Sequence, residues 1–210
     1  MSQDGELAGL ISGAETLGTV IDEGTGQRLL TYLDLLYRWN RTAGLTTIPR
    51  DSAMRLHILD SLTVRPLLPA GSVADLGTGA GLPGIPLAIS DPALRFTLIE
   101  SSRRKCSFLH EARRVLGLDL EIVEMDAEKV AGSGRRFRTV VSRAFRSPER
   151  MPALAHRLLA PGGHLVVMTT PGTDPESLEM ADLSVIEELR VQLPQGGESR
   201  LLLKLRKNQH

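Results

Sequence analysis

The chain has little cysteine, few aromatic residues and no long apolar run. Its single cysteine, Cys106, excludes an internal disulfide and any zinc site built on cysteines, and no metal site is expected elsewhere. Because the apolar stretches are short and interrupted by charge or proline, no membrane span is expected. The first residues lack the basic start and the apolar core of a signal peptide. Together these absences indicate a cytoplasmic protein that does not contact membranes.

A net charge is also missing, since 25 Lys and Arg balance 25 Asp and Glu. The charges are nevertheless unevenly distributed, because residues 95–157 contain 14 basic and 8 acidic residues, which leaves 11 basic and 17 acidic residues elsewhere. Two interpretations of this asymmetry remain open. The basic residues either cover solvated helix faces and loops, or they form a one-sided basic surface that binds a polyanion.

The length of 210 residues suits one domain with a small extension. Near the N-terminus, the spacing of apolar residues predicts an amphipathic helix at 27–42 and a second helix at 52–64. Residues 1–25 show only weak periodicity, so this segment is expected to be partly frayed. We therefore expect residues 1–68 to form an N-terminal helical extension that packs on a core domain of residues 69–207.

Within the core domain, short apolar runs alternate with helical patterns. Such alternation implies β-α-β units and a mainly parallel sheet with helices on both faces. The last two apolar runs have no helix between them, which predicts an antiparallel strand pair at one edge. The expected fold is therefore α/β, with a mainly parallel seven-stranded sheet. The predicted strands are 72–76, 95–100, 120–124, 137–142, 164–169, 183–194 and 199–207, and the predicted helices are 85–90, 105–117 and 149–159.

A glycine-rich loop follows the first predicted strand, in the stretch VADLGTGAGLPGIPLAI. A loop between the first strand and its helix lies at the carboxyl end of a parallel sheet, where ligands usually bind. The spacing Gly79-x-Gly81-x-x-Gly84 matches the fingerprint of dinucleotide-binding proteins, and Glu100 at the end of the next strand could then hold a ribose. A match of this kind is weak by itself, so a dinucleotide remains one alternative and a loop without any ligand another.

Two details of the loop favour S-adenosylmethionine (AdoMet) over a dinucleotide. The carboxylate of Asp75 would repel a pyrophosphate but suits a ligand that carries positive charge. Pro83 and Pro86 remove two N–H donors where a phosphate would need them. AdoMet has no phosphate, carries a cationic sulfonium and ammonium, and offers a ribose diol to Glu100. The basic stretch 103–105 could suggest the phosphate of NADP, but Glu100 beside it argues against that ligand.

Asp126, Ala127 and Glu128 follow the third predicted strand. The side chain of Asp126 could accept a hydrogen bond from the adenine amino group, with the backbone of Ala127 and Glu128 beside the ring. It could equally cap the short helix that follows, and the two roles are compatible.

The segment after the fourth predicted strand, which usually faces the methyl group, reads VVSRAF. It lacks the Asn/Asp-Pro-Pro-aromatic run of adenine and cytosine amino methyltransferases. A pyrimidine C5 enzyme would need a cysteine here, whereas Cys106 lies elsewhere and is expected to pack in the core. The segment offers Ser142, Arg143 and Phe145, which suits a substrate atom that is already nucleophilic.

Several motifs, in order along roughly residues 27–205, resemble one family closely: the bacterial 16S rRNA guanine-N7 methyltransferases, also called the glucose-inhibited division protein B family. The stretches LPGIP after the glycines, HILDS before them and SRA after the fourth strand are specific in combination. The matching motifs are YRWNRTAGLTTI (37–48), HILDSL (57–62), DLGTGAGLPGIPLAI (75–89), FTLIES (96–101), DAE (126–128) and VSRAF (141–145).

The resemblance implies a Rossmann-like class I AdoMet-dependent methyltransferase fold with a C-terminal antiparallel strand pair. It implies methyl transfer to N7 of one guanine in 16S rRNA or in the 30S subunit, and we expect the chain to act as a monomer. Guanine N7 carries a free lone pair at neutral pH, so catalysis needs alignment rather than a general base. The cofactor contacts implied are Gly77, Gly79, Leu82, Glu100, Ala127, Glu128 and Arg143.

Several residues are candidates for contact with the substrate RNA. Arg143 could bond guanine O6 or an RNA phosphate, position the cofactor, or form a surface ion pair. Phe145 could stack on the base or pack in the core, and Arg146 is a further candidate for RNA contact. His57 and Asp60 lie three residues apart on one helix face, so they form either a hydrogen-bonded pair that docks the extension or a wall of the RNA pocket.

The chain departs from the family pattern in three places. The family commonly has Asn where this chain has Gly44, often has Arg at the position of Leu56, and commonly has Leu-Lys-Gly where this chain reads MTTPG at 168–172. A lysine there could contact phosphate, so its loss leaves open the RNA target and an RNA-binding module without activity. A methyltransferase that acts on another RNA or on a small molecule is a separate alternative. Because aromatic residues make up only 3% of the chain, RNA recognition is expected to be mainly electrostatic.

Overall fold

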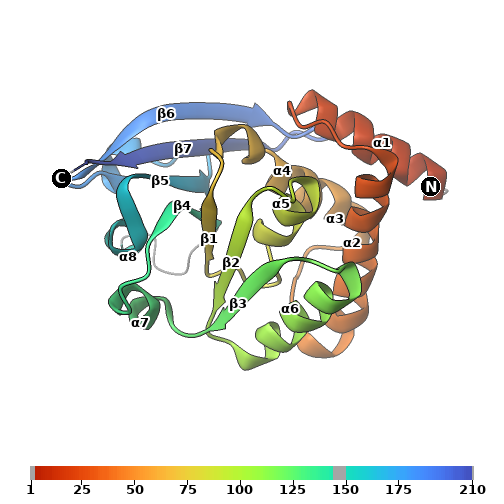
Figure 1. The fold of residues 1–210 in the computed structure, drawn as a ribbon. Coiled ribbons are helices and arrows are strands. Elements are labelled where there is room, and N and C mark those ends of the chain that lie inside the picture. Colours follow the sequence, from red (N-terminus) through yellow and green to blue (C-terminus); the bar gives the residue numbers. More distant parts are fainter. Residues whose placement is uncertain (1–2, 144–149, 210) are drawn as a thin grey trace.

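The computed structural model describes residues 3–143 and 150–209, and a seven-stranded sheet forms the centre of the described chain (Figure 1). The strand order is β3-β2-β1-β4-β5-β7-β6; β1 to β5 are parallel, while β7 runs antiparallel to both β5 and β6. The predicted mainly parallel sheet with an antiparallel pair at one edge is therefore confirmed. The strands are β1 (Ser72–Leu76), β2 (Arg95–Glu100), β3 (Leu120–Glu124), β4 (Phe137–Arg143), β5 (Leu159–Thr169), β6 (Leu183–Gln192) and β7 (Ser199–Lys207).

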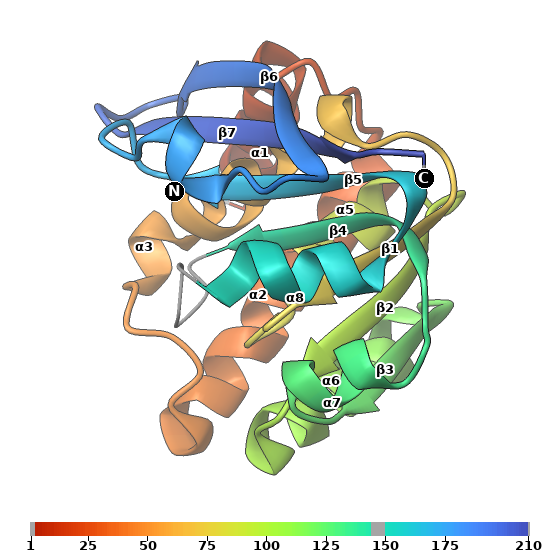
Figure 2. The ribbon, with the colours of Figure 1, turned by 90° about the vertical axis from the view of Figure 1, so that its left-hand side faces the viewer.

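Helices cover both faces of the sheet, as the alternating pattern predicts. Figures 1 and 2 show α1, α2, α5 and α6 on one side and α7 and α8 on the other. The helices are α1 (Gln3–Thr16), α2 (Glu23–Ala43), α3 (Arg50–Ala53), α4 (Asp60–Leu62), α5 (Gly84–Ser90), α6 (Arg103–Leu116), α7 (Ala127–Gly132) and α8 (Met151–Leu158), with short segments η1 (Met54–Leu59), η2 (Arg65–Leu67) and η4 (Pro175–Leu178). Within the described residues, no helix is both long and apolar enough to cross a membrane.

The burial of the strands follows their place in the sheet. In β1, at the centre, four consecutive residues from Val73 to Leu76 are buried because helices cover both faces. In β6, at the edge, most residues after Leu183 are exposed or half-buried. Strand β5 begins five residues earlier than predicted, since the expected turn at 161–163 forms an irregularity in its pairing with β4.

The first helix was not foreseen, and the expectation of a frayed N-terminus is wrong for residues 3–16. Leu10 and Ala14 of α1 are fully buried. Glycines allow this close packing, because a Cβ at Gly13 would lie 2.7 Å from Leu59 Cδ1 and a Cβ at Gly26 would lie 2.6 Å from Leu7 Cδ1. Small residues at the contact weaken the apolar periodicity, so the sequence pattern conceals a helix that tertiary packing stabilises.

The helix predicted at 52–64 is divided. Residues 50–62 stay helical throughout, but η1 is a π-helical turn in which the amide of Asp60 donates to the carbonyl of Arg55. A π-turn widens the helix by one residue per turn and often lies at functional sites. It changes the direction of every side chain that follows, including that of Asp60.

The N-terminal helices share one hydrophobic core with the sheet. Leu33 of α2, Leu98 of β2 and Phe108 of α6 belong to the same buried cluster. The hydroxyl of Tyr32 donates to the carbonyl of Ala80 at 2.7 Å, and both residues are buried. The helices thus brace the glycine loop directly, whereas the division into an extension of residues 1–68 and a domain of residues 69–207 stays a prediction.

Candidate functional site

The glycine loop turns sharply after β1. Gly77, Gly79 and Gly81 all have positive φ angles, of 72°, 62° and 91°. At Gly81 a side chain is excluded twice, since a Cβ there would also lie 2.4 Å from Ile85 Cδ1. The amides of Gly77 and Thr78 donate to the carbonyl of Ile99 in β2, at 3.0 and 3.1 Å. These bonds hold the loop against the end of the neighbouring strand.

Asp75 supports this loop from inside the protein. Its Oδ2 atom accepts hydrogen bonds from the hydroxyl of Thr78 at 2.6 Å and from the amide of Gly84 at 2.8 Å. Its Oδ1 atom is buried and has no partner among the described residues. Burial raises the pKa of Asp75 to about 6, and the nearby charge of Glu100 adds to this rise. Asp75 therefore shapes the loop, although we had expected it to face the ligand.

Glu100 at the end of β2 is only 8% exposed, and its carboxylate holds the glycine loop in place. Its Oε2 accepts from the amide of Gly79 at 3.0 Å and lies 3.7 Å from Lys105 Nζ, while its Oε1 accepts from the amide of Ser102 at 2.8 Å. A carboxylate oxygen can accept two hydrogen bonds. Each oxygen of Glu100 therefore keeps acceptor capacity for a further donor, such as a ribose hydroxyl.

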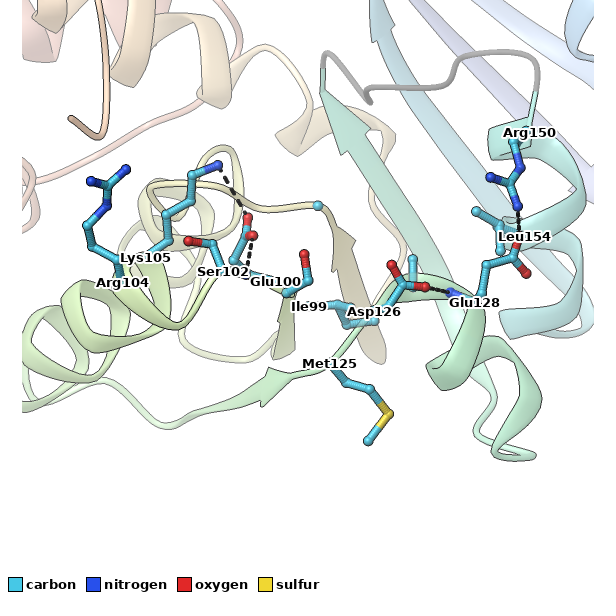
Figure 3. Close-up of a pocket in the computed structure, with 13 residues that line it drawn as sticks. Ile99, Glu100, Ser102, Arg104, Lys105, Met125, Asp126, Glu128, Arg150 and Leu154 are labelled. Carbon is cyan, nitrogen blue, oxygen red and sulfur yellow. Dashed lines mark hydrogen bonds and ion pairs between the residues drawn. The ribbon is translucent and has the colours of Figure 1, made fainter. Parts of the chain in front are cut away.

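A cleft of about 710 Å³ opens beside Glu100. Its size is within the range of small-molecule sites. Figure 3 shows Arg104 and Lys105 on one side and Glu128 and Arg150 on the other. The lining residues are Gly77, Ile99, Glu100, Ser101, Ser102, Arg104, Lys105, Met125, Asp126, Ala127, Glu128, Arg150 and Leu154.

The lining combines polar groups with a few apolar ones. Met125 is 42% exposed, an unusual state for a methionine, and Ile99 and Leu154 also contribute to the wall. Flexible methionine side chains adapt readily to a flat apolar surface such as an aromatic ring. The donor and acceptor set thus fits AdoMet: a carboxylate with free lone pairs for the diol and an apolar wall for the adenine.

Asp126 follows β3 and is the N-cap residue of α7. The Oδ1 atom of Asp126 accepts from the amide of Glu128 at 2.9 Å, so its capping of α7 is confirmed. A contact with adenine stays a prediction. The carboxylate of Glu128 forms ion pairs with Arg150 and, at 3.3 Å, with Arg157. Its backbone remains the part that can reach a ligand in the cleft.

The predicted cofactor residues thus divide into two groups. Gly77, Glu100, Asp126, Ala127 and Glu128 line the cleft, while Asp75, Gly79, Leu82 and Arg143 do not. Gly79 still acts on the cleft through its bond to Glu100. Leu82 is buried in the hydrophobic core instead.

Arg143 belongs to a polar cluster in which Asp60 is buried and the arginines are partly exposed. Its Nη1 lies 3.1 Å from Asp60 Oδ2 and donates to the carbonyl of Leu56 at 3.3 Å. The other oxygen of Asp60 accepts from Arg200 Nε at 2.7 Å. Arg143 therefore forms a half-buried ion pair rather than the surface pair considered from the sequence. Sequence reasoning missed Arg200, because no local pattern connects β7 with a helix 140 residues earlier.

His57 is 2% exposed, and its Nε2 lies 3.0 Å from the hydroxyl of Thr46. Its Nδ1 has no partner in the described part of the chain. Burial and the nearby Arg143 charge lower the pKa of His57 to about 4, so the ring is neutral at pH 7. No hydrogen bond joins the side chains of His57 and Asp60, although the backbone amide of Asp60 donates to the carbonyl of His57. The two residues instead contact different neighbours, Thr46 and the arginine pair.

Of the remaining residues singled out from the sequence, two lie outside the described structure and one ends a helix. Phe145 and Arg146 lie outside the described residues. Gly44 ends α2 with a φ of 54°, a conformation that asparagine also tolerates, so this departure from the family pattern preserves the backbone.

The basic segment 95–157 is partly neutralised. Arg114, Arg135 and Arg150 each form an ion pair with a glutamate. Arg104 at the cleft has no ion-pair partner among residues 3–143 and 150–209 and is exposed. The extended basic surface therefore stays a prediction. Arg104, at the start of α6, is an exposed and unpaired charge that lines the cleft.

Comparisons with known proteins show the family to which this chain is similar. Residues 25–200 match the model of the GidB family, described as rRNA small subunit methyltransferase G. Proteins named ribosomal RNA small subunit methyltransferase G share 40% identity over 190 residues in Nitrosospira multiformis (86% of this chain, 87% of that one) and 38% over 208 residues in Hydrogenovibrio crunogenus (97% and 95%).

A solved structure of lower similarity matches the fold alone. It is the 1,6-didemethyltoxoflavin-N1-methyltransferase of Burkholderia thailandensis with bound S-adenosylhomocysteine, at 18% identity and a TM-score of 0.55, covering 71% of this chain and 76% of that one. The family model and the two relatives each match most of this chain. This chain therefore belongs to the rRNA small subunit methyltransferase G family, GidB.

Proposed function

We propose that this chain transfers the methyl group of AdoMet to N7 of one guanine in the ribosomal RNA of the small subunit. The observation that carries the proposal is Glu100, a carboxylate with spare acceptor capacity at the wall of a ligand-sized cleft beside a glycine loop. Family membership supports rRNA as the substrate. The target atom follows from the resemblance in the motifs and from the chemistry of the site.

The roles of individual residues belong to this proposal. Glu100 binds the ribose diol, and Asp126 with the backbone of Ala127 and Glu128 surrounds the adenine. AdoMet, when bound, supplies an electrophilic methyl group on a cationic sulfur. The protein then needs only to hold the target nitrogen in line, because guanine N7 has no proton to remove. The neutral His57 and the paired Arg143 offer positioning groups rather than a strong base.

The proposed partner is the 30S subunit or its 16S rRNA, and the chain acts as a monomer. A single copy supplies every group named above. The unpaired charge of Arg104 at the cleft favours RNA over a small-molecule substrate. The match to rRNA methyltransferases along most of the chain favours RNA as well.

The experiment is transfer of labelled methyl from AdoMet to purified 30S subunits that lack their native N7 methylation. Cleavage at 7-methylguanine locates the modified position, and incorporation at one guanine is expected. A matched RNA with 7-deazaguanosine at that position removes only the accepting nitrogen and should receive no label. Transfer to the deaza RNA would contradict the N7 assignment. Intact AdoMet binding by calorimetry without transfer to 30S would move the target elsewhere.

A further inference from the structure

Two arginines from distant strands share the single carboxylate of Asp60. Arg143 comes from the end of β4 and Arg200 from the start of β7, and their side chains are 20% and 23% exposed, against 3% for Asp60. The cluster therefore carries one more positive than negative charge. The neighbouring carboxylate of Glu198 forms an ion pair with Arg55 and also interacts with the charge of Arg200. With this pair included, three arginines still face two carboxylates, so the excess positive charge remains.

The guanidinium groups keep unused donors. Arg143 bonds only through Nη1, and Arg200 bonds through Nε to Asp60 and through Nη1 to the carbonyl of Ser199. Within the described residues, Nε and Nη2 of Arg143 and Nη2 of Arg200 have no acceptor. Because both side chains are partly exposed, these donors can reach an external acceptor, and the planar fork of arginine matches the oxygens of a phosphate. The cluster therefore has the excess positive charge and the free donors to bind one further anion.

Strand register places this cluster beside the cleft. Asp75 of β1 pairs with Val141 of β4, so Arg143 lies level with Gly77, which lines the cleft. Leu201 of β7 pairs with Thr169, the last residue of β5, so Arg200 lies at the same carboxyl edge of the sheet. An RNA strand that delivers a base to the cleft would pass this edge.

We propose that Asp60 positions Arg143 and Arg200 as a clamp for one phosphate of the substrate RNA, and that Arg200 is a substrate-binding residue. The inference rests on the proposed function, because it takes RNA as the substrate. Asp60 does not touch the RNA; it is a positioning residue that fixes the angle between the two guanidinium forks. A phosphodiester is the chemical group that the clamp recognises, independent of sequence.

The test compares Arg200→Gln with Arg206→Gln in the full chain. Arg206 lies six residues along the same strand, and its side chain projects to the same face, so it controls for loss of one positive charge. Binding to unmethylated 30S subunits is measured from 50 to 300 mM salt, and AdoMet binding is measured by calorimetry. We expect Arg200→Gln to weaken 30S binding at least tenfold and to lower the slope of log affinity against log salt by about 0.7–0.9.

The same variant should bind AdoMet within twofold of wild type, and Arg206→Gln should change neither quantity by more than twofold. An unchanged salt slope and 30S affinity in Arg200→Gln would overturn the clamp. Weakened AdoMet binding would also overturn it, because the pair would then serve the carboxylate of the cofactor. If the wild-type protein binds 30S subunits but transfers no methyl group, the proposed function is contradicted. The salt slopes of 30S binding in the two variants still test the clamp in that case.

Asp60→Asn tests the positioning role. It removes the charge that holds both arginines while keeping the shape of the side chain. We expect the same reduction in salt slope as in Arg200→Gln, and no further reduction in the double variant, since both changes dismantle one site. Additive reductions would contradict a shared clamp. Should Asp60→Asn fail to fold, as judged by circular dichroism, the Arg200→Gln and Arg206→Gln pair still decides the proposal.

Discussion

The amide of Gly79 donates a hydrogen bond to Oε2 of Glu100 across 3.0 Å, and this bond joins the glycine loop after β1 to the end of β2 at the cleft wall. A backbone group of the loop and a carboxylate 21 residues later thus form one rigid edge. The carboxylate is both a support for the loop and a candidate ligand acceptor, so its loss affects the cleft in two ways.

Replacement of Glu100 by glutamine should weaken AdoMet binding about 10- to 100-fold, because a charge-assisted hydrogen bond contributes about 1.5–3 kcal/mol. The amide of glutamine would also direct a donor toward the backbone amide of Gly79 or Ser102. Calorimetry with AdoMet measures the effect. Glu124→Gln is the matched control, since Glu124 pairs with Glu100 in register but is exposed and does not line the cleft. Equal affinities in the two variants would contradict the role of Glu100.

Removal of the Tyr32 hydroxyl should loosen the glycine loop from behind. In Tyr32→Phe the carbonyl of Ala80 stays buried without its partner, which costs about 1–3 kcal/mol of unfolding free energy. AdoMet affinity should fall as well, because the loop loses its brace. Tyr37→Phe removes a comparable hydroxyl bond to the carbonyl of Ile48, away from the loop, and should lower stability alone. Urea unfolding and calorimetry separate the two effects, and equal AdoMet affinity in both variants would contradict the bracing role.

Asp75 should make the stability of the protein depend on pH. Burial raises the pKa of Asp75 from 3.8 to about 6 in the folded state, so folding favours its protonated form. The stabilisation from this group is full below about pH 4 and is lost as pH rises through 6. Asp75→Asn cannot titrate. The unfolding free energy of wild type relative to this variant should therefore fall by up to about 3 kcal/mol between pH 4 and pH 7. Urea titrations at several pH values test this, and a constant difference would contradict it.

Arg104 should contribute to the electrostatic part of RNA binding. It is exposed at the start of α6, at the cleft, where an RNA backbone can reach it. In Arg104→Gln we expect affinity for 30S subunits to fall about threefold to tenfold at low salt, with a smaller difference at high salt because screening weakens exposed charges. Filter binding across a salt series measures this. Arg113→Gln, near the other end of the same helix, is the control, and an equal loss there would indicate net charge rather than position.

Much of the fold was predictable because its signals are local. The alternation of short apolar runs with helical patterns predicts the parallel strands, and the direct connection of the last two predicts the edge pair. Glu100 and the glycine loop were found for the same reason, since a strand, a tight turn and a carboxylate at the next strand end leave a pattern in sequence. The helix α1 was missed because close packing at glycines, Gly13 against η1 and Gly26 of α2 against α1, stabilises it, and apolar periodicity does not record such contacts.

The sequence by itself determined the order of the strands and of most helices along the chain and the sharp turn after β1, because each depends on residues close together in the chain. Only the tertiary structure decided that Asp75 supports the loop from inside while Glu100 lines the cleft, and that Asp60 holds Arg143 and Arg200 together. Partners 83 and 140 residues away meet through sheet register and a π-turn. Their ion pairs depend on geometry that no local pattern of residues encodes.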